Sequence, residues 1–114
     1  MLNFKRLREV NVKRCSESFH GLDSWSPSDW ATAFGGEAGE ALNMVKKLRR
    51  HFQGTNFDKD PKTTTEIINL IGNELADAIL YADLLAARLN IDLEDAIIRK
   101  FNSVSIEKKS QYML

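Results

Sequence analysis

Hydrophobic residues recur with a helical period along almost the whole chain, and no segment alternates as a β-strand would. Four amphipathic segments stand out. The expected helices run from about Asn3 to Phe19, from Pro27 to about His51, from Thr63 to about Leu89, and from just after Asp92 to about Lys108. The pattern predicts an all-α fold, a bundle of about four helices that forms one domain over residues 1–114.

Local signals mark where these helices begin. Ser26 suits a capping position and Pro27 the first helical position of the second segment. Thr63, followed three residues later by Glu66, has the spacing of a capping box at the start of the third. Between these helices, the polar stretch "QGTNFDKDPK" (53–62) predicts a loop, which we expect to be the most mobile part of the chain.

The second segment carries two acids among its apolar positions. Its main apolar face is formed by Trp30, Phe34, Ala41, Met44, Val45 and Leu48. Glu37 falls in the middle of this face and Glu40 on its flank. The third segment, which is apolar around most of its circumference, repeats the anomaly with Glu74 and Asp77. All four carboxylates are therefore expected to be buried.

Buried carboxylates need partners, because desolvating an unpaired charge costs several kcal/mol. A spacing of three residues places Glu37 beside Glu40, and Glu74 beside Asp77. If the two helices pack together, the four acids face one another, and their pKa values rise unless a cation neutralises them. Ligands that are all oxygen favour Mg²⁺, with Mn²⁺ as a substitute. The pattern predicts a metal site.

Two lysines are candidates for contacting phosphates bound to such a metal. Lys100 lies within the apolar stripe of the fourth segment, and Lys47 lies on the same flank of the second segment as Glu40. Each has an ordinary interpretation as well. Lys100 fits a side chain that extends to solvent or pairs with an acid, and Lys47 fits the solvated basic run "KKLRR".

The motifs "E37-A-G-E40" and "E74-L-A-D77" resemble the E-x-x-E and E-x-x-D pair of the MazG-like all-α nucleoside triphosphate pyrophosphatases. The surrounding "GEAGEALNMVKKLRR", Tyr81 four residues after the aspartate, and "RKFNSVS" near the end are similar too. The resemblance covers roughly residues 27–105. At Gly36, where many relatives carry a further glutamate, this chain departs from the pattern.

The resemblance implies Mg²⁺-dependent hydrolysis of a nucleoside triphosphate to the monophosphate and pyrophosphate, by a helical bundle that forms homodimers or homotetramers. It implies that Glu37, Glu40, Glu74 and Asp77 hold the metal and that one of them orients the attacking water. A role in clearing unwanted nucleotides follows from the same likeness. Hydrolysis of dUTP or of a phosphoribosyl-nucleotide, which related folds carry out, stays open.

Four further residues are candidates for contacting the substrate. Trp25 and Tyr81 have aromatic rings that could stack on a base, as could Trp30, although Trp25 and Trp30 also have the spacing of a hydrophobic staple. Asn102 belongs to the family-like tail but points away from the apolar stripe of its helix, so capping or a contact between subunits would equally explain it.

The composition of the chain limits which partners and which cellular setting we expect. Sixteen basic and sixteen acidic residues cancel, so bulk electrostatics give no reason to expect nucleic-acid binding. The single cysteine, Cys15, cannot form an internal disulfide, and no segment approaches the length of a membrane span or looks like a targeting signal. We expect a soluble, cytoplasmic protein that contacts no membrane.

Two other classes remain. A di-iron or di-manganese carboxylate bundle requires Glu-x-x-His motifs, and neither histidine lies three residues after a motif glutamate. A non-catalytic interaction module would instead pair the acids with Lys47 or Lys100 at a subunit interface. Either way, a third helix with apolar residues nearly all round predicts a homodimer or homotetramer, because one chain cannot cover it.

Overall fold

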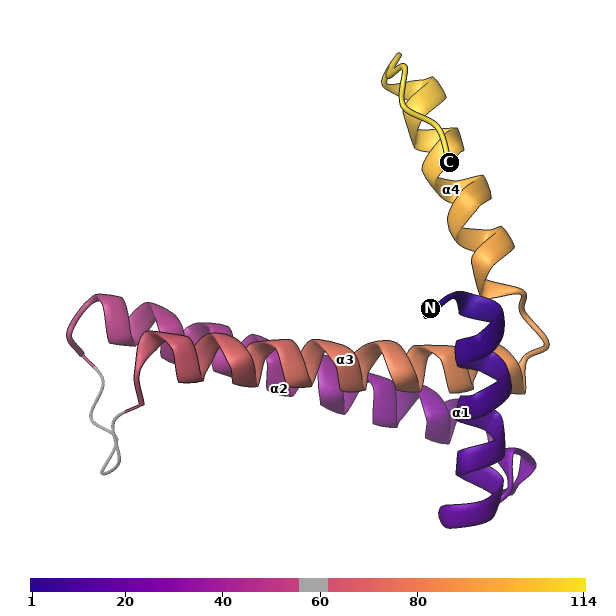
Figure 1. The fold of residues 1–114 in the computed structure, drawn as a ribbon, viewed down its shortest axis with the longest axis horizontal. Coiled ribbons are helices and arrows are strands. Elements are labelled where there is room, and N and C mark those ends of the chain that lie inside the picture. Colours follow the sequence, from indigo (N-terminus) through magenta and orange to yellow (C-terminus); the bar gives the residue numbers. More distant parts are fainter. Residues whose placement is uncertain (56–61) are drawn as a thin grey trace. The chain divides into compact units, whose positions relative to one another are not determined.

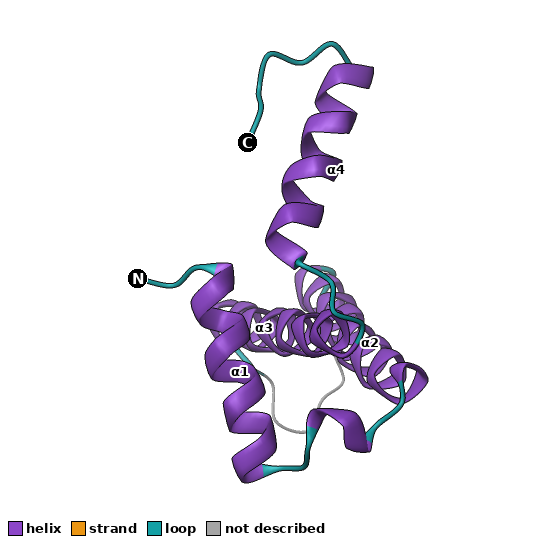
Figure 2. Cartoon of the chain, turned by 90° about the vertical axis from the view of Figure 1, so that its right-hand side faces the viewer, coloured by secondary structure: helices purple, strands orange, loops and turns teal. Residues whose placement is uncertain are grey.

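The computed structural model describes residues 1–55 and 62–114. Its helices are α1 (Phe4–Ser18), the short 3-10 helix η1 (Leu22–Ser24), α2 (Pro27–Phe52), α3 (Thr64–Arg88) and α4 (Leu93–Glu107) (Figure 1). The described residues contain no strand, as Figure 2 shows. The all-α prediction is confirmed, with helix bounds close to those expected. Most of the predicted loop over 53–62 lies outside the described residues.

Two of the predicted helix starts are confirmed by their caps. The Thr63 hydroxyl accepts a hydrogen bond from the Glu66 backbone N–H at 3.2 Å and donates to the Glu66 carboxylate at 3.1 Å. The Asp92 side chain accepts from the Asp95 backbone N–H at 3.0 Å. These contacts satisfy N–H groups that a helix start leaves without an intrahelical partner.

The chain divides into two compact units, each described here by itself. The hairpin unit is Ser28–Ala82, and the terminal unit combines Met1–Pro27 with Asp83–Leu114. α3 contributes residues 64–82 to the first and 83–88 to the second. The prediction of a single domain stays a prediction.

In the hairpin unit, α2 and α3 run antiparallel beside each other (Figure 1). At the end nearer the α2–α3 connection, the ring Nε2 of His51 lies 2.9 Å from the Thr64 hydroxyl. Toward the other end, the rings of Trp30 and Tyr81 have centroids 6.2 Å apart. Trp30 of α2 and Ile67 of α3 are the most deeply buried apolar side chains that the structure describes in this unit.

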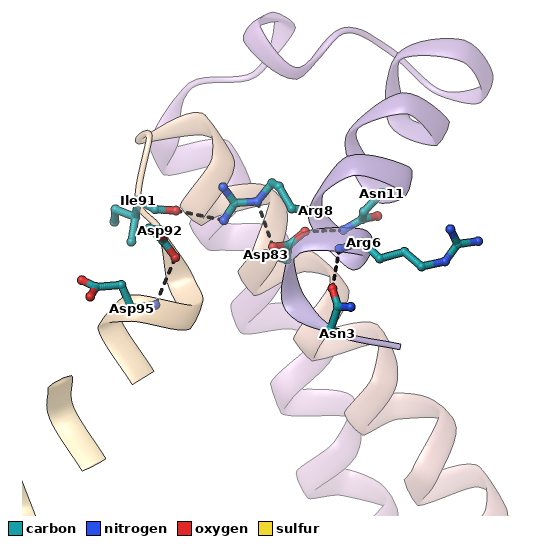
Figure 3. Close-up of polar contacts among 8 residues, drawn as sticks. All are labelled: Asn3, Arg6, Arg8, Asn11, Asp83, Ile91, Asp92 and Asp95. Carbon is teal, nitrogen blue, oxygen red and sulfur yellow. Dashed lines mark hydrogen bonds and ion pairs between the residues drawn. The ribbon is translucent and has the colours of Figure 1, made fainter. Parts of the chain in front are cut away.

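The terminal unit is organised around one buried acid, Asp83, whose exposed fraction is 1%. Figure 3 shows Arg8 of α1 placed between two acceptors: its Nε donates to Asp83 at 2.9 Å and its Nη2 to the Ile91 carbonyl at 3.0 Å. The Asn11 amide donates to the other Asp83 oxygen at 3.1 Å. These bonds tie α1 to the end of α3 and to the turn that leads into α4.

Asp83 was not among the acids that the sequence pattern singled out. Its burial is tolerated because a guanidinium and an amide satisfy both carboxylate oxygens. A single chain leaves part of the apolar surface of α3 uncovered, since Ile68, Leu75 and Ile79 are each about half exposed. Only one side of α3 faces α2 in the hairpin. Within the described ranges, no helix combines the length and hydrophobicity that crossing a bilayer requires.

Removing the Arg8 guanidinium should destabilise the terminal unit. Arg8→Met keeps most of the aliphatic stem but leaves the Asp83 charge buried with only Asn11 as partner. We expect the free energy of unfolding to fall by about 2–4 kcal/mol, because breaking one side of a buried ion pair strands the other. Urea denaturation followed by circular dichroism measures the change.

The matched control is Lys13→Met, which removes the exposed pair between Lys13 and Glu9 on the same helix. That variant should change stability by no more than about 0.5 kcal/mol. Equal effects of the two substitutions would contradict the role given to Asp83.

Candidate metal centre

The hairpin brings together three of the four acids that the motifs predict. Glu37 comes from α2, and Glu74 and Asp77 come from α3, three residues apart. Each offers one carboxylate oxygen, and these three oxygens lie within 4.8 Å of one another. We call this group the acidic trio. The antiparallel register of α2 and α3 creates it, because that register sets Glu37 opposite both acids of α3.

Glu40 lies beside the acidic trio without belonging to it. Its side chain is exposed, and its carboxylate is near enough to Glu74 to help raise the pKa of that carboxyl. The structure therefore distinguishes the four predicted acids: three share a potential ion position, and the fourth is a neighbouring carboxylate with access to solvent.

The expectation that all four acids are buried was wrong. Glu37 and Glu74 are half-buried, whereas Glu40 and Asp77 are exposed. In a pair of helices, side chains at the edge of the contact remain open to water. Glu40 and Asp77 are exposed for this reason. An open edge also leaves room for water molecules or for oxygens of a ligand, which Mg²⁺ usually retains in its coordination shell.

Crowding and partial desolvation change how the acids titrate. The pKa of Glu74 is raised from its ordinary value of 4.5, first by desolvation, then by the hydrogen bond with Glu40 and by the charges of Glu40, Glu37 and Asp77. The pKa of Glu37 is also raised, again first by desolvation and then by Glu40 and Asp77, while a hydrogen bond with Glu74 acts the other way. The group therefore favours holding a proton or a cation.

One atom of the acidic trio has no partner. Glu74 Oε2 has essentially no accessible surface and accepts no hydrogen bond from the described residues. A buried oxygen without a donor is costly, and a bound cation would satisfy it. The donor set consists of carboxylates with no histidine or cysteine, which suits Mg²⁺ or Mn²⁺ better than zinc. The residues present thus fit the predicted metal.

Gly36, the position at which the chain departs from the MazG-like pattern, has open space beside it. A Cβ added at Gly36 or at Gly39 would meet no other atom within 4 Å. Packing within the chain therefore does not require glycine at these positions, although each lowers the stability of a helix relative to alanine. The absence of a fifth acid, at position 36, is therefore not a steric necessity.

Of the predicted substrate-binding residues, only Lys47 and Tyr81 belong to the same unit as the acidic trio. Both are half-buried. Trp30, considered as a stacking partner for a base, is 1% exposed and packs near Tyr81, so its ring is not accessible in the hairpin. Tyr81 keeps partial exposure beside it.

Trp25, Lys100 and Asn102 lie in the terminal unit. The Trp25 ring stacks on His20, with centroids 4.5 Å apart. The Asn102 amide donates to the Leu114 carbonyl at 3.1 Å, and its oxygen accepts from the Leu114 N–H at 2.8 Å, which holds the chain after α4 against that helix.

Lys100 is exposed and lines an apolar groove on α4. The sequence pattern placed it within a buried stripe, but two stripe members, Ile97 and Val104, are more than a third exposed. The burial of this stripe was predicted from the period of the helix alone, and the described part of the terminal unit does not supply a full covering for it.

The acidic trio should make stability depend on pH in a defined direction. Because the pKa values of Glu37 and Glu74 are higher in the folded chain than 4.5, the folded chain binds protons more tightly than the unfolded chain. Their contribution to stability is therefore greatest at low pH and is lost as pH rises from 4.5 through the raised values. Thermal unfolding of wild type and Glu74→Gln between pH 4.5 and 7.5, without divalent ions, measures this contribution. The melting temperature of wild type minus that of the variant should fall as the pH rises.

At pH 7.5, Mg²⁺ should restore the stability that is lost when Glu37 and Glu74 ionise. A cation at the acidic trio stabilises the folded chain by mass action, so the wild-type melting temperature should rise with Mg²⁺ concentration. Glu74→Gln should respond much less, while Glu17→Gln, which changes an exposed acid of α1, should respond as wild type does. An identical response in all three proteins would contradict a specific site.

No family model, no curated protein and no solved structure matches this chain. The resemblance to MazG-like pyrophosphatases therefore stays a prediction from the motifs. The metal-binding and substrate-binding roles of the named residues stay predictions as well, supported by the geometry of the acidic trio.

Proposed function

We propose that this protein is a Mg²⁺-dependent nucleoside triphosphate pyrophosphatase of the MazG-like kind. The observation that carries the proposal is the acidic trio, in which three carboxylates from two helices share one potential ion position, and in which Glu74 Oε2 has no hydrogen-bond partner among the described residues. The order and spacing of the E-x-x-E and E-x-x-D motifs support the same reaction.

In this proposal, Glu37, Glu74 and Asp77 hold the metal. When bound, Mg²⁺ supplies neutralising charge and polarises phosphate oxygens. Glu40, exposed and next to the trio, orients the attacking water and accepts its proton. The water oxygen forms a bond to the α-phosphorus, and the bond from that phosphorus to the bridging oxygen breaks. Pyrophosphate leaves with the bridging oxygen, and the nucleoside monophosphate remains.

The substrate class is a nucleoside triphosphate, and the biological role we propose is control of the nucleotide pool in the cytoplasm. Lys47 would contact phosphate and Tyr81 would contact the nucleoside, since both lie in the hairpin unit with the acids. For Lys100, Asn102 and Trp25, which belong to the terminal unit, substrate binding stays a prediction from the sequence. Hydrolysis of dUTP or of a phosphoribosyl-nucleotide is the nearest alternative reaction.

The rival classes have less support. In an interaction module, Lys47 would neutralise the acids, but among the described residues no ion pair joins it to any of them. A di-iron or di-manganese bundle would bring histidine to the metal, and the acidic trio contains only carboxylates. A site of oxygen ligands for Mg²⁺ is the simplest interpretation.

We also propose that the protein forms homodimers or homotetramers. The half-exposed Ile68, Leu75 and Ile79 on α3 give an apolar surface that a second subunit would cover. Sedimentation velocity at micromolar concentration should therefore show a mass of two or four chains, and a single monomeric species would contradict this part of the proposal.

Product analysis tests the reaction. The protein would be incubated with Mg²⁺ and a panel of ribo- and deoxynucleoside triphosphates, and the products separated by ion-exchange chromatography. We expect monophosphate and pyrophosphate, with activity lowered about a hundredfold or more in Glu40→Gln and in Asp77→Asn, because these groups act on the water or the metal. Glu17→Gln is the matched control and should keep wild-type activity.

Two results would contradict the proposal. Diphosphate and inorganic phosphate as products would place cleavage at a different bond. Full activity in both Glu40→Gln and Asp77→Asn, with circular dichroism showing intact helices, would rule out the acids as the site.

A further inference from the structure

The terminal unit contains a cavity that the proposed function does not use. Its volume is about 440 Å³, which suits a small organic molecule. The walls come from α1, from Asp83 of α3, and from residues 90–94, which lead into α4. None of these residues is a candidate for binding the metal or the nucleotide, so the cavity needs an explanation of its own.

The α1 side of the cavity is positively charged. Lys5 and Arg8, three residues apart on one face of α1, both line it. Arg8 donates from Nε to Asp83 and from Nη2 to the Ile91 carbonyl (Figure 3). These two bonds hold the guanidinium in one orientation, while its Nη1 group has no acceptor among the described residues. A carboxylate in the cavity would therefore meet a guanidinium that is already oriented.

Lys5 adds a second cation. Its side chain is exposed, and no ion pair joins it to any described residue. The charge of Asp83 does not cancel it, because both oxygens of that carboxylate are already bound by Arg8 and Asn11. The Lys5 ammonium group can therefore reach an anionic group held by Arg8.

The α4 side of the cavity is acidic. Asp92 and Glu94 both line it. Asp92 has a local role, since its side chain caps α4 by accepting from the Asp95 N–H. Glu94, in the first turn of α4, complements the helix dipole, but its exposed carboxylate forms no ion pair with a described residue. A cationic group in the cavity would therefore meet Glu94.

Apolar side chains complete the lining. Phe4 and Leu93 are half-buried, and Ile91 is 41% exposed. We call these three residues the apolar wall. Contact with a hydrocarbon group would remove more of their surface from water, which favours a ligand with an apolar part.

We propose that this cavity binds a free α-amino acid with an apolar side chain. The carboxylate of the ligand binds Arg8 and Lys5, its ammonium group binds Glu94, and its side chain lies against the apolar wall. A ligand with only a negative charge would face the acids of α4, and one with only a positive charge would face the cations of α1. A zwitterion satisfies both sides.

Binding in this cavity would also stabilise the terminal unit. The ligand would join α1 to the start of α4, next to the bond by which Arg8 already holds the Ile91 carbonyl. A ligand that binds only the folded chain raises the free energy of unfolding by mass action. The melting temperature should therefore rise with the concentration of the amino acid.

Calorimetric titration and thermal unfolding with L-leucine and L-phenylalanine test the proposal. Isoamylamine and isocaproate carry the leucine side chain with only one charged group, and phenethylamine and hydrocinnamate do the same for phenylalanine. We expect at least one of the two amino acids to bind with a dissociation constant of about 1 mM or less and to raise the melting temperature. Its two analogues should each bind about tenfold more weakly or worse, because one charge-assisted contact is lost.

Substitutions locate the site. Lys5→Met and Glu94→Gln should each weaken binding of the amino acid about fivefold or more. The matched controls are Lys13→Met on α1 and Asp95→Asn in the first turn of α4, neither of which lines the cavity. Each control should change binding by less than about twofold. Circular dichroism checks that all four variants keep their helices.

Three results would overturn the inference: no binding of either amino acid by wild type, binding of a singly charged analogue as tight as that of its amino acid, or equal weakening by the cavity variants and their controls. Hydrolysis of nucleotides is a separate measurement, so none of these results would affect the proposed function.

Discussion

Apolar packing between α2 and α3 fixes the register of the hairpin, and the candidate metal centre depends on that register. Trp30 of α2 packs beside Tyr81 of α3, and Glu37 lies opposite the two acids of α3. A shift of one helical turn along either helix would separate the carboxylates. The seam thus uses the free energy of hydrophobic burial to hold together like charges that would otherwise repel each other.

The buried acid of the terminal unit and the acids of the hairpin unit differ in whether their carboxylate oxygens have hydrogen-bond partners. Asp83 is almost completely buried, and Arg8 and Asn11 satisfy both of its oxygens, so its role is to join α1 to the end of α3. Glu74 is less buried, yet within residues 1–55 and 62–114 one of its oxygens has no hydrogen-bond partner, and its neighbours are other acids. The first arrangement is complete within the chain, whereas the second is satisfied only by a proton or a cation, which is typical of a functional site.

Helical periodicity and capping signals were sufficient to predict the elements, because both depend on contacts between residues a few positions apart. Thr63 with Glu66 and Asp92 with Asp95 form local contacts that the sequence shows directly. Burial was predicted less well. The half-exposed Leu75 and Ile79 of α3, and the exposure of Glu40 and Asp77, depend on how many helices surround a given face, and periodicity does not report that number.

By itself, the sequence determined the all-α class, the approximate helix bounds and the pairing of acids three residues apart, since a spacing of three on a helix already places side chains together. Only the tertiary structure decided that three of the four acids come together at one potential ion position while Glu40 stays beside them. Only the tertiary structure identified Asp83 as the deeply buried acid, because its partner Arg8 is 75 residues away in the chain. Contacts between such distant residues arise from packing, which no local pattern encodes.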